Sequence, residues 1–374
     1  MAGALIGLVL WVLPAVAGLE RFLYDRLSVT AAPDPSLEEI VIVGIDEPSF
    51  AEIGRWPWDR SVHAALIDQI SAQGATGIGI DLLFAEPSQS AAEDEALRDA
   101  LRRAQDRGVP VVLAASRSVI ETGMARQVVS IRPLEMFTED GGAVAGFVTL
   151  PVDVDGAVRH MPSEREGFAS LLAAFTGAFN GAGDRIRFAA SDWPYSSAYQ
   201  AVRADEDLPA DFFSGKTVLI GYWSSVEAGL DKGADSFRTP LTARGEALTP
   251  GVAIHASLLA GYREEGHIRH GGAVWRAGLI VLLAAAAWSL FRFVSPGRSV
   301  LFTLAIVGGL LGLAALGLKV GLVWLPVTGP MALFVSGAIG ATGGGLVGER
   351  LEREALRRLF GRYVADSVIE KMSG

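Results

Sequence analysis

The apolar residues of this chain gather into four long blocks without a charged residue, and this clustering limits the possible folds more than any other feature. One block lies near the N-terminus and three follow one another in the last third of the chain, over residues 5–19, 277–291, 300–318 and 320–347. A helix needs about 20 mainly apolar residues to cross the hydrocarbon core of a bilayer. The sequence therefore predicts an all-α bundle of four transmembrane helices surrounded by membrane lipid.

The distribution of charge predicts which side of the membrane each part faces. Residues 20–272 hold 22 Lys and Arg against 37 Asp and Glu, a net charge of −15, whereas the rest of the chain has a net charge of +5. Arg292 and Arg298 lie between the second and third blocks, and five more arginines follow the fourth. Because Lys and Arg concentrate on the cytoplasmic side of membrane proteins, we expect residues 20–272 outside and the C-terminus in the cytoplasm.

The first apolar block allows two interpretations. It is short, and Ala15-Val16-Ala17 has the small residues of a signal-peptide cleavage site, so the block could be removed in the mature protein. It lacks the basic residues that usually precede such a block. With the block retained, we expect a transmembrane helix at 3–19, an extracytoplasmic domain at 20–272, three transmembrane helices at 273–348 and a cytoplasmic coupling helix at 349–374.

The segment outside the membrane has the pattern of an α/β domain. A β-branched run at 39–46 is followed by a helical pattern at 61–73, a second apolar run at 77–84, a helical pattern at 91–107 and a third run at 109–114. This alternation predicts a parallel or mixed sheet with helices on its faces. Further strands are expected at 143–150 and 216–221, and further helices at 168–179 and 250–262. The chain has no cysteine, so the domain must be stable without disulfide bonds.

Charged and aromatic residues cluster where the first two predicted strands end. Ligands of doubly wound α/β proteins bind outside the carboxyl ends of the strands, and rings, guanidinium groups and carboxylates together could recognise a small polar molecule. A purely structural role is the alternative, in which Arg55 and Arg60 pair with Asp46 and Asp81 to close the end of the sheet and the tryptophans fill the corner. The candidate ligand-binding or structural cluster is Asp46, Arg55, Trp56, Trp58, Arg60, Asp81 and Glu86.

We expect no catalytic residue, metal site or cofactor in this chain. The five histidines do not show zinc-site spacing, and residues 153–156 read better as a turn than as a calcium loop, because the remaining ligands are missing. No serine lies in a nucleophile elbow. The acidic composition also argues against a nucleic-acid partner.

The C-terminal residues predict a helix with one apolar face and arginines on the rest. The spacing of the apolar residues matches a helix face that packs against a partner, and a second copy of the chain in a homodimer could provide it. Glycines at 308, 312, 340 and 344 could allow close packing between transmembrane helices, or could simply reflect ordinary membrane-helix composition. The expected signal-coupling residues are Leu356, Leu359, Phe360, Tyr363 and Val364.

Several motifs together resemble the second type of CHASE domain, an extracellular sensor of bacterial adenylate and guanylate cyclases and histidine kinases. Gly54-Arg-Trp-Pro-Trp58 is the most specific of them, and the resemblance covers residues 30–265 in order. The other motifs lie at residues 42–46, 77–84, 153–159, 219–221, 235–241 and 250–256. The resemblance implies a multi-pass protein of the bacterial inner (plasma) membrane, with the sensor in the periplasm or outside the cell and an effector in the cytoplasm.

Residues 360–369 resemble the segment that enters the catalytic core of class III nucleotide cyclases. Relatives with that effector convert ATP to cyclic AMP with metal-bound aspartates, so ATP and Mg²⁺ are expected only for a core that this sequence does not contain. We expect a sensor that answers an unidentified small molecule or protein outside the cell. The alternatives are the sensor half of a histidine kinase or other effector, a scaffold that senses nothing, and a periplasmic metal-dependent hydrolase that uses Asp46, Asp81 and Glu86.

Overall fold

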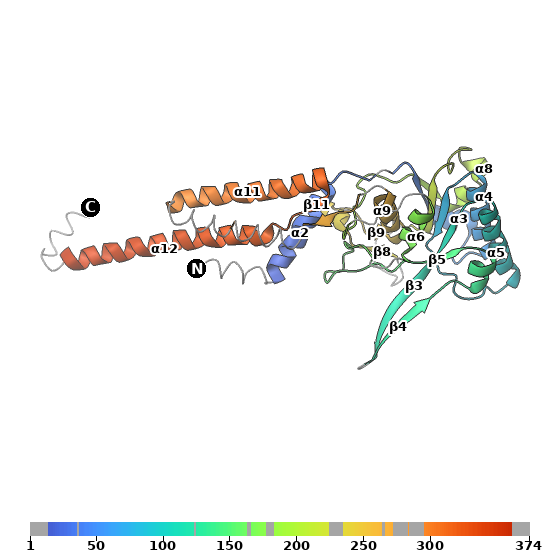
Figure 1. Cartoon of the computed structure of the whole chain (residues 1–374), viewed down its shortest axis with the longest axis horizontal. Coiled ribbons are helices and arrows are strands. Elements are labelled where there is room, and N and C mark those ends of the chain that lie inside the picture. Colours follow the sequence, from blue (N-terminus) through green and yellow to red (C-terminus); the bar gives the residue numbers. More distant parts are fainter. Residues whose placement is uncertain are drawn as a thin grey trace. The chain divides into compact units, whose positions relative to one another are not determined.

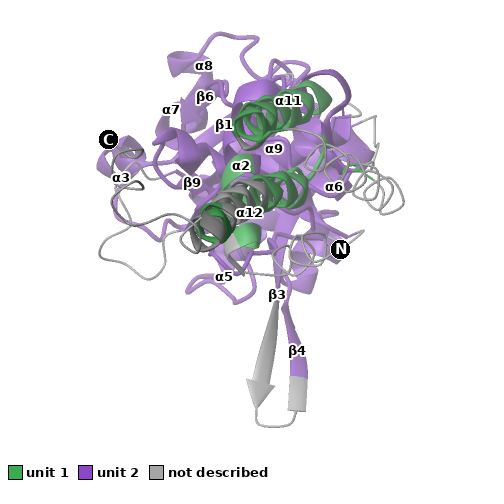
Figure 2. Ribbon diagram, turned by 90° about the vertical axis from the view of Figure 1, so that its left-hand side faces the viewer, with its two compact units in different colours: residues 1–23, 271–317, 324–374 green, residues 24–270, 318–323 purple. Residues whose placement is uncertain are grey.

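The structure is a computed structural model in which the chain divides into two compact units (Figure 2). Unit 1 contains residues 1–23, 271–317 and 324–374, and unit 2 contains residues 24–270 and 318–323. The described residues are 14–35, 37–122, 125–162, 166–176, 183–223, 235–263, 266–271, 283 and 295–360.

Unit 2 is built on a mainly parallel sheet, which confirms the predicted α/β fold (Figure 1). Strand β1 pairs in parallel with β6 on one side and β7 on the other, β7 pairs with β2, and β2 pairs with β3. Strand β3 pairs in parallel with β5 and, further along, antiparallel with β4. The strands are β1 (Ile40–Ile45), β2 (Gly77–Ile80), β3 (Val111–Thr122), β4 (Ala125–Ile131), β5 (Val144–Phe147), β6 (Tyr195–Ser197) and β7 (Thr217–Tyr222).

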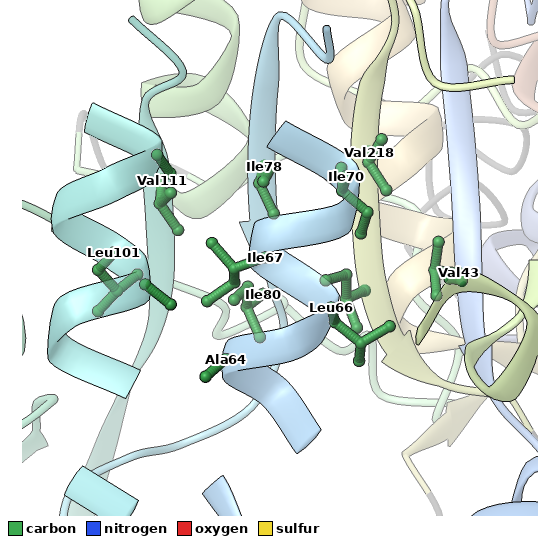
Figure 3. Packing of buried hydrophobic residues seen from close by; sticks show 14 of the residues in the cluster. Val43, Ala64, Leu66, Ile67, Ile70, Ile78, Ile80, Leu101, Val111 and Val218 are labelled. Carbon is green, nitrogen blue, oxygen red and sulfur yellow. The ribbon is translucent and has the colours of Figure 1, made fainter. Parts of the chain in front are cut away.

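Helices cover both faces of this sheet because the central strands are apolar on both faces. In β1, Val41, Val43 and Ile45 belong to one buried cluster, while Ile40 and Ile42 belong to another. The first cluster is completed by residues of α4 (Arg60–Ala72), α5 (Ala91–Asp106) and α7 (Ala198–Val202), and Figure 3 shows the side chains of α4 over β2. The second cluster is completed by α6 (Phe168–Phe175) and α9 (Gly251–Arg263).

Glycines in the strands allow α6 to pack close to the sheet. A Cβ added to Gly79 of β2 would lie 2.7 Å from Leu219 Cδ2 and 2.8 Å from Phe168 Cζ. At Gly146 of β5 it would lie 2.7 Å from the Cα of Phe168. The bare backbone at these positions therefore forms the surface on which α6 lies.

Several boundaries differ from the prediction; strand β2, for example, was expected over residues 77–84 but ends at Ile80. Strand β3 was expected to end at Ala114, but it continues to Thr122 and forms a hairpin with β4 that projects from the rest of unit 2 (Figure 1). Its second half was missed because it carries polar residues and lies beyond the part of the sheet that the helices cover. Helix α9 begins at Gly251, one residue later than expected, because Thr249 and Pro250 pair as β9 (Thr249–Pro250) with β8 (Ser236–Phe237).

The remaining short elements connect the layers. They are α3 (Glu47–Ile53), η1 (Met136–Asp140), α8 (Ala204–Asp207), η2 (Pro240–Arg244), β10 (Arg269–His270) and β11 (Val323–Trp324). Helix α2 (Pro14–Ala31) contributes residues 24–31 to unit 2.

Unit 1 contains long apolar helices. Among the described residues, one stretch is long and apolar enough to cross a membrane, Gly297–Gly321 within α11 (Pro296–Gly321), with a mean hydropathy of 2.3. The first two predicted spans fall largely outside the described residues. The fourth was expected to begin at Val320, but α12 (Thr328–Phe360) begins later, after the extended β11, and its described part holds an apolar stretch at Thr328–Gly340. The bundle of four spans therefore stays a prediction.

Candidate functional site

A cavity of about 590 Å³ lies in unit 2 at the carboxyl end of the sheet. Tyr222 is the last residue of β7, Asp81 directly follows β2, and Val148 directly follows β5. Because the carboxyl ends of parallel strands meet at one edge, residues far apart in the chain line one space, as in other α/β folds. The lining residues are Trp56, Asp81, Leu82, Leu83, Ser116, Val148, Leu150, Tyr222, Asp235 and His255.

Asp81 is the most unusual side chain of the cavity. Its main chain is held to β7 by a hydrogen bond from its backbone N–H to the Ile220 carbonyl, 2.8 Å long. Its side chain is only 7% exposed, and its carboxylate accepts no hydrogen bond from the described residues. His255 Nε2 lies 4.0 Å from the carboxylate. Burial raises the pKa of Asp81 to about 7, because the charged form loses its hydration.

Asp235 and His255 complete the polar part of the cavity. Burial and the nearby negative charge of Asp81 raise the pKa of Asp235 to about 6. The Asp235 carboxylate can approach the start of α9 because Gly251 has no side chain there. The His255 ring lies against the Phe168 ring with centroids 5.1 Å apart, and burial lowers the pKa of His255 to about 4. At neutral pH the imidazole is therefore uncharged.

Asp46 does not belong to the cavity, although it also follows a strand. It caps α3: its Oδ1 accepts hydrogen bonds from the Ser49 backbone N–H at 3.0 Å and the Ser49 hydroxyl at 2.5 Å. Its Oδ2 accepts from the Tyr195 hydroxyl at 2.7 Å and the Ser197 hydroxyl at 2.5 Å. Burial alone would raise the pKa of Asp46, but these hydrogen bonds together hold it below its usual value.

The ion pairs considered from the sequence are wrong for Arg60. Its guanidinium group pairs with Asp94 of α5 and donates to the Glu86 carbonyl, and it lies 5.5 Å from the centroid of the Phe84 ring. Arg60 thus joins the start of α4 to the start of α5 instead of pairing with Asp46 or Asp81. Sequence reasoning missed Asp94 because it lies 34 residues away, inside a pattern that reads as an ordinary surface helix.

The two tryptophans divide between the core and the cavity. Trp58 is buried and donates from its indole Nε1 to the Gly54 carbonyl at 2.9 Å. Trp56 packs edge-on against it, with ring centroids 5.3 Å apart, and lines the cavity. Arg55 and the side chain of Glu86 are exposed and do not line it. Of the predicted cluster, the structure therefore brings only Trp56 and Asp81 to the cavity, and Asp46, Asp81 and Glu86 do not gather into one acid/base or metal site.

The residues that sequence reasoning missed come from later segments. His255 lies within the apolar helical pattern at 250–262, and Asp235 is the first residue of the motif at 235–241, so neither pattern marks a site. Neither is near Asp81 in the sequence, so only the fold brings them together. Among the described residues, no group of three or more His, Asp or Glu side chains is arranged to hold a metal ion.

The expected coupling residues lie at the C-terminal end of unit 1. Leu356 is on α12 and its side chain is 52% exposed. Leu359 and Phe360 are the last residues of α12, whereas Tyr363 and Val364 lie outside the described residues. The structure thus places Leu356, Leu359 and Phe360 of the predicted apolar face on one helix.

One family model, described as the CHASE2 domain, matches residues 2–294. This match confirms the resemblance seen in the motifs and includes every residue that lines the cavity. No curated protein and no solved structure matches the chain. The chain therefore belongs to the CHASE2 family, whose domain is an extracellular sensor domain of signalling proteins.

Proposed function

We propose that this chain is the membrane-anchored sensor part of a bacterial class III adenylate or guanylate cyclase. In this account residues 24–270 bind a stimulus outside the inner (plasma) membrane, and α12 relays the event to a cytoplasmic effector that makes cyclic nucleotide. The observation that carries the proposal is the cavity at the carboxyl end of the sheet, where a buried carboxylate that accepts no hydrogen bond from the described residues faces a space large enough for a small molecule.

Exposed apolar side chains on α11 support the membrane anchoring. Leu301, Leu304 and Val320 are 68%, 64% and 78% exposed, and few residues of the apolar stretch Gly297–Gly321 are buried. A continuous apolar surface of this kind on a helix is unfavourable in water and stable in lipid. Lipid and further spans are the surroundings that fit it.

The length of α12 suits a relay. Its 33 residues correspond to about 50 Å of helix, whereas the hydrocarbon core is about 30 Å thick. A helix of this length that crosses the bilayer would extend well beyond it and carry Leu351 and Leu356 into the cytoplasm. In the structure of the single chain both side chains are exposed. We propose that a second copy of the chain covers them in a homodimer, and that ligand binding changes this pairing.

The cyclase effector rests on the resemblance of residues 360–369 to the entry of a class III catalytic core. ATP and Mg²⁺ belong to that core in this proposal, and the present chain contributes no catalytic residue. Its own partners are lipid, a second copy and the stimulus, without nucleic acid.

The proposal is tested with a chimera in which residues 1–374 precede the catalytic core of a class III adenylate cyclase, expressed in bacteria without their own cyclase. Trp56→Ala and Asp81→Asn change the lining of the cavity, and Asp106→Asn removes an exposed acid that does not line it. We expect the two cavity variants to change cyclic AMP at least threefold and Asp106→Asn to match the unsubstituted chimera. Cavity variants that are folded and produce the same cyclic AMP as the unsubstituted chimera would refute the sensor role.

A further inference from the structure

The unusual feature of the cavity is a buried carboxylate to which none of the described residues donates a hydrogen bond. Buried polar groups nearly always have hydrogen-bond partners, because losing those of water is costly. Asp46 illustrates the rule with hydrogen bonds from Ser49, Tyr195 and Ser197. Asp81 is almost as buried, yet it receives none from the described residues and lines the cavity. A ligand with a hydrogen-bond donor would supply in the cavity what the described residues do not.

The charges around the cavity favour a cation. Its titratable side chains are Asp81 on the segment after β2, Asp235 on the segment before β8, His255 on α9 and Tyr222 at the end of β7. Two of them are acids, His255 is uncharged at neutral pH, and no lysine or arginine is among the lining residues in the described part of the chain. A phosphate or carboxylate ligand would therefore meet like charges from Asp81 and Asp235, whereas a cation would be attracted by them.

The walls indicate that the cation has an apolar body. Leu82, Val148 and Leu150 provide aliphatic surface, and Trp56 and Tyr222 provide aromatic rings, which attract cations through their faces. A volume of about 590 Å³ is far more than a bare metal ion fills, and no three described His, Asp or Glu converge on one point there.

We propose that this cavity binds a small organic cation, an ammonium group carried on a compact apolar body, with the ammonium donating to the Asp81 and Asp235 carboxylates. The inference rests on the proposed function, since it takes the cavity as the ligand site of the sensor, and it adds the chemical class of the ligand. Trp56 and the aliphatic wall hold the body, so both parts of the ligand contribute to binding.

The test compares three probes that share one body and differ in the polar group: phenethylammonium, 2-phenylethanol and 3-phenylpropionate. Binding to the full chain in lipid nanodiscs is measured by titration calorimetry. We expect phenethylammonium to bind at least tenfold more tightly than the alcohol, and the carboxylate not to bind. Asp81→Asn is expected to weaken phenethylammonium binding at least tenfold, whereas Asp106→Asn, which removes an acid elsewhere, leaves it unchanged.

A second measurement detects the protons that the cavity aspartates release when phenethylammonium binds. Phenethylammonium stays protonated below about pH 9, as other alkyl ammonium groups do, whereas Asp81 and Asp235 are partly protonated near neutral pH. Binding should therefore release protons, seen as a binding enthalpy that depends on the ionisation enthalpy of the buffer, and its affinity should rise between pH 6 and pH 8. In Asp81→Asn both effects should shrink. Asp235→Asn provides the same comparison if the first variant does not fold.

Several results would overturn the inference. Equal binding of the three probes would show an apolar cavity without charge selection. Calcium or magnesium binding that depends on Asp81 and displaces phenethylammonium would show a metal site. Phenethylammonium binding that survives in both Asp variants would place the probe elsewhere. If phenethylammonium binds as expected but the cavity variants leave the chimera's cyclic AMP unchanged, the ligand class stands and the sensor role fails. If the cavity variants change cyclic AMP but phenethylammonium does not bind, the sensor role stands and the ligand class fails.

Discussion

At the scale of single residues, two aspartates that follow strands of the same sheet have opposite environments. Asp46 accepts hydrogen bonds from Ser49, Tyr195 and Ser197, which hold its pKa below the usual value, whereas burial raises the pKa of Asp81 to about 7. The first arrangement stabilises the charged form and the fold. The second arrangement opposes the charged form and lowers the stability of the fold. A buried carboxylate that costs stability in this way is typical of a functional position, because it brings no structural benefit.

Asp81 should make the stability of the protein depend on pH. Its folded pKa of about 7 lies above the unfolded value of 3.8, so from pH 4 to pH 7 the unfolded state gives up the proton more readily and the protein loses stability as the pH rises. Asp81→Asn removes this loss. We expect the variant's stability advantage in urea unfolding to grow by about 1.4 kcal/mol per pH unit over this range and to level off above it. An advantage that does not change with pH would show that Asp81 is not buried as described.

Asp46, in contrast, should stabilise the folded protein. Asp46→Ala removes the cap of α3 and leaves the buried hydroxyls of Ser49 and Ser197 without their acceptor. We expect the free energy of unfolding to fall by about 3 kcal/mol. Glu52→Ala, on the exposed side of the same helix, is the control and should change it little. A loss no larger than that of the control would contradict the hydrogen-bond network.

At the scale of elements, helix α2 is tied to a turn by one buried arginine. Arg159 is 3% exposed and binds Asp25 of α2 in a bidentate pair at 2.7 and 2.8 Å, and it also contacts Asp153 and Asp155 of the 153–156 turn. The carboxylates raise the pKa of this guanidinium group further above neutrality. The Asp-x-Asp-Gly pattern, which resembles a calcium loop, thus serves an internal cation.

Lysine cannot replace this arginine, because an ammonium group does not make a planar bidentate pair and leaves carboxylate oxygens without donors. We expect Arg159→Lys to reduce the free energy of unfolding by about 3 kcal/mol, measured by urea unfolding of the full chain in detergent. Arg238→Lys, an exposed arginine beside the same turn, serves as the comparison. Equal stability of the two variants would mean that the pair with Asp25 does not hold α2.

The contact between α6 and the sheet depends on glycine. A valine at position 79 would press its side chain against Leu219, Phe168 and Leu172, so the helix would have to move away from β2. We expect Gly79→Val to cost about 3 kcal/mol and to lower the midpoint of thermal unfolding. Gly297→Ala is the control: a Cβ at this position meets no atom within 4 Å, so the substitution should leave the free energy of unfolding nearly unchanged. Normal stability of Gly79→Val would refute the close packing.

The same scale shows how much the sequence predicts. The parallel strands at residues 40–45, 77–80 and 217–222 could be predicted from their apolar runs. Each strand is buried on both faces, so its own residues identify it without knowledge of the strands that it pairs with. The β3–β4 hairpin could not be predicted in the same way, since its polar residues carry no burial signal. In the candidate site, Trp56 and Asp81 were found beside strand ends, but Asp235 and His255 join them only through the fold.

At the scale of the whole molecule, an extracytoplasmic sensor needs unit 2 and the C-terminal end of α12 on opposite sides of the membrane. Unit 2 carries the cavity and most of the acidic residues, and the arginines after residue 349 lie at the end of α12 and beyond it. The chain has no cysteine, so a single introduced cysteine reports its own position without interference. Glu95 of α5 and Glu354 of α12 are exposed and provide one probe in each region.

Labelling of these two cysteines in spheroplasts with a membrane-impermeant maleimide tests the orientation directly. The account predicts that Glu95→Cys is labelled in intact spheroplasts and that Glu354→Cys is labelled only after the membrane is opened with detergent. The cysteine-free chain gives the background. Labelling of Glu354→Cys in intact spheroplasts together with protection of Glu95→Cys would place the cavity inside the cell and contradict an extracytoplasmic sensor.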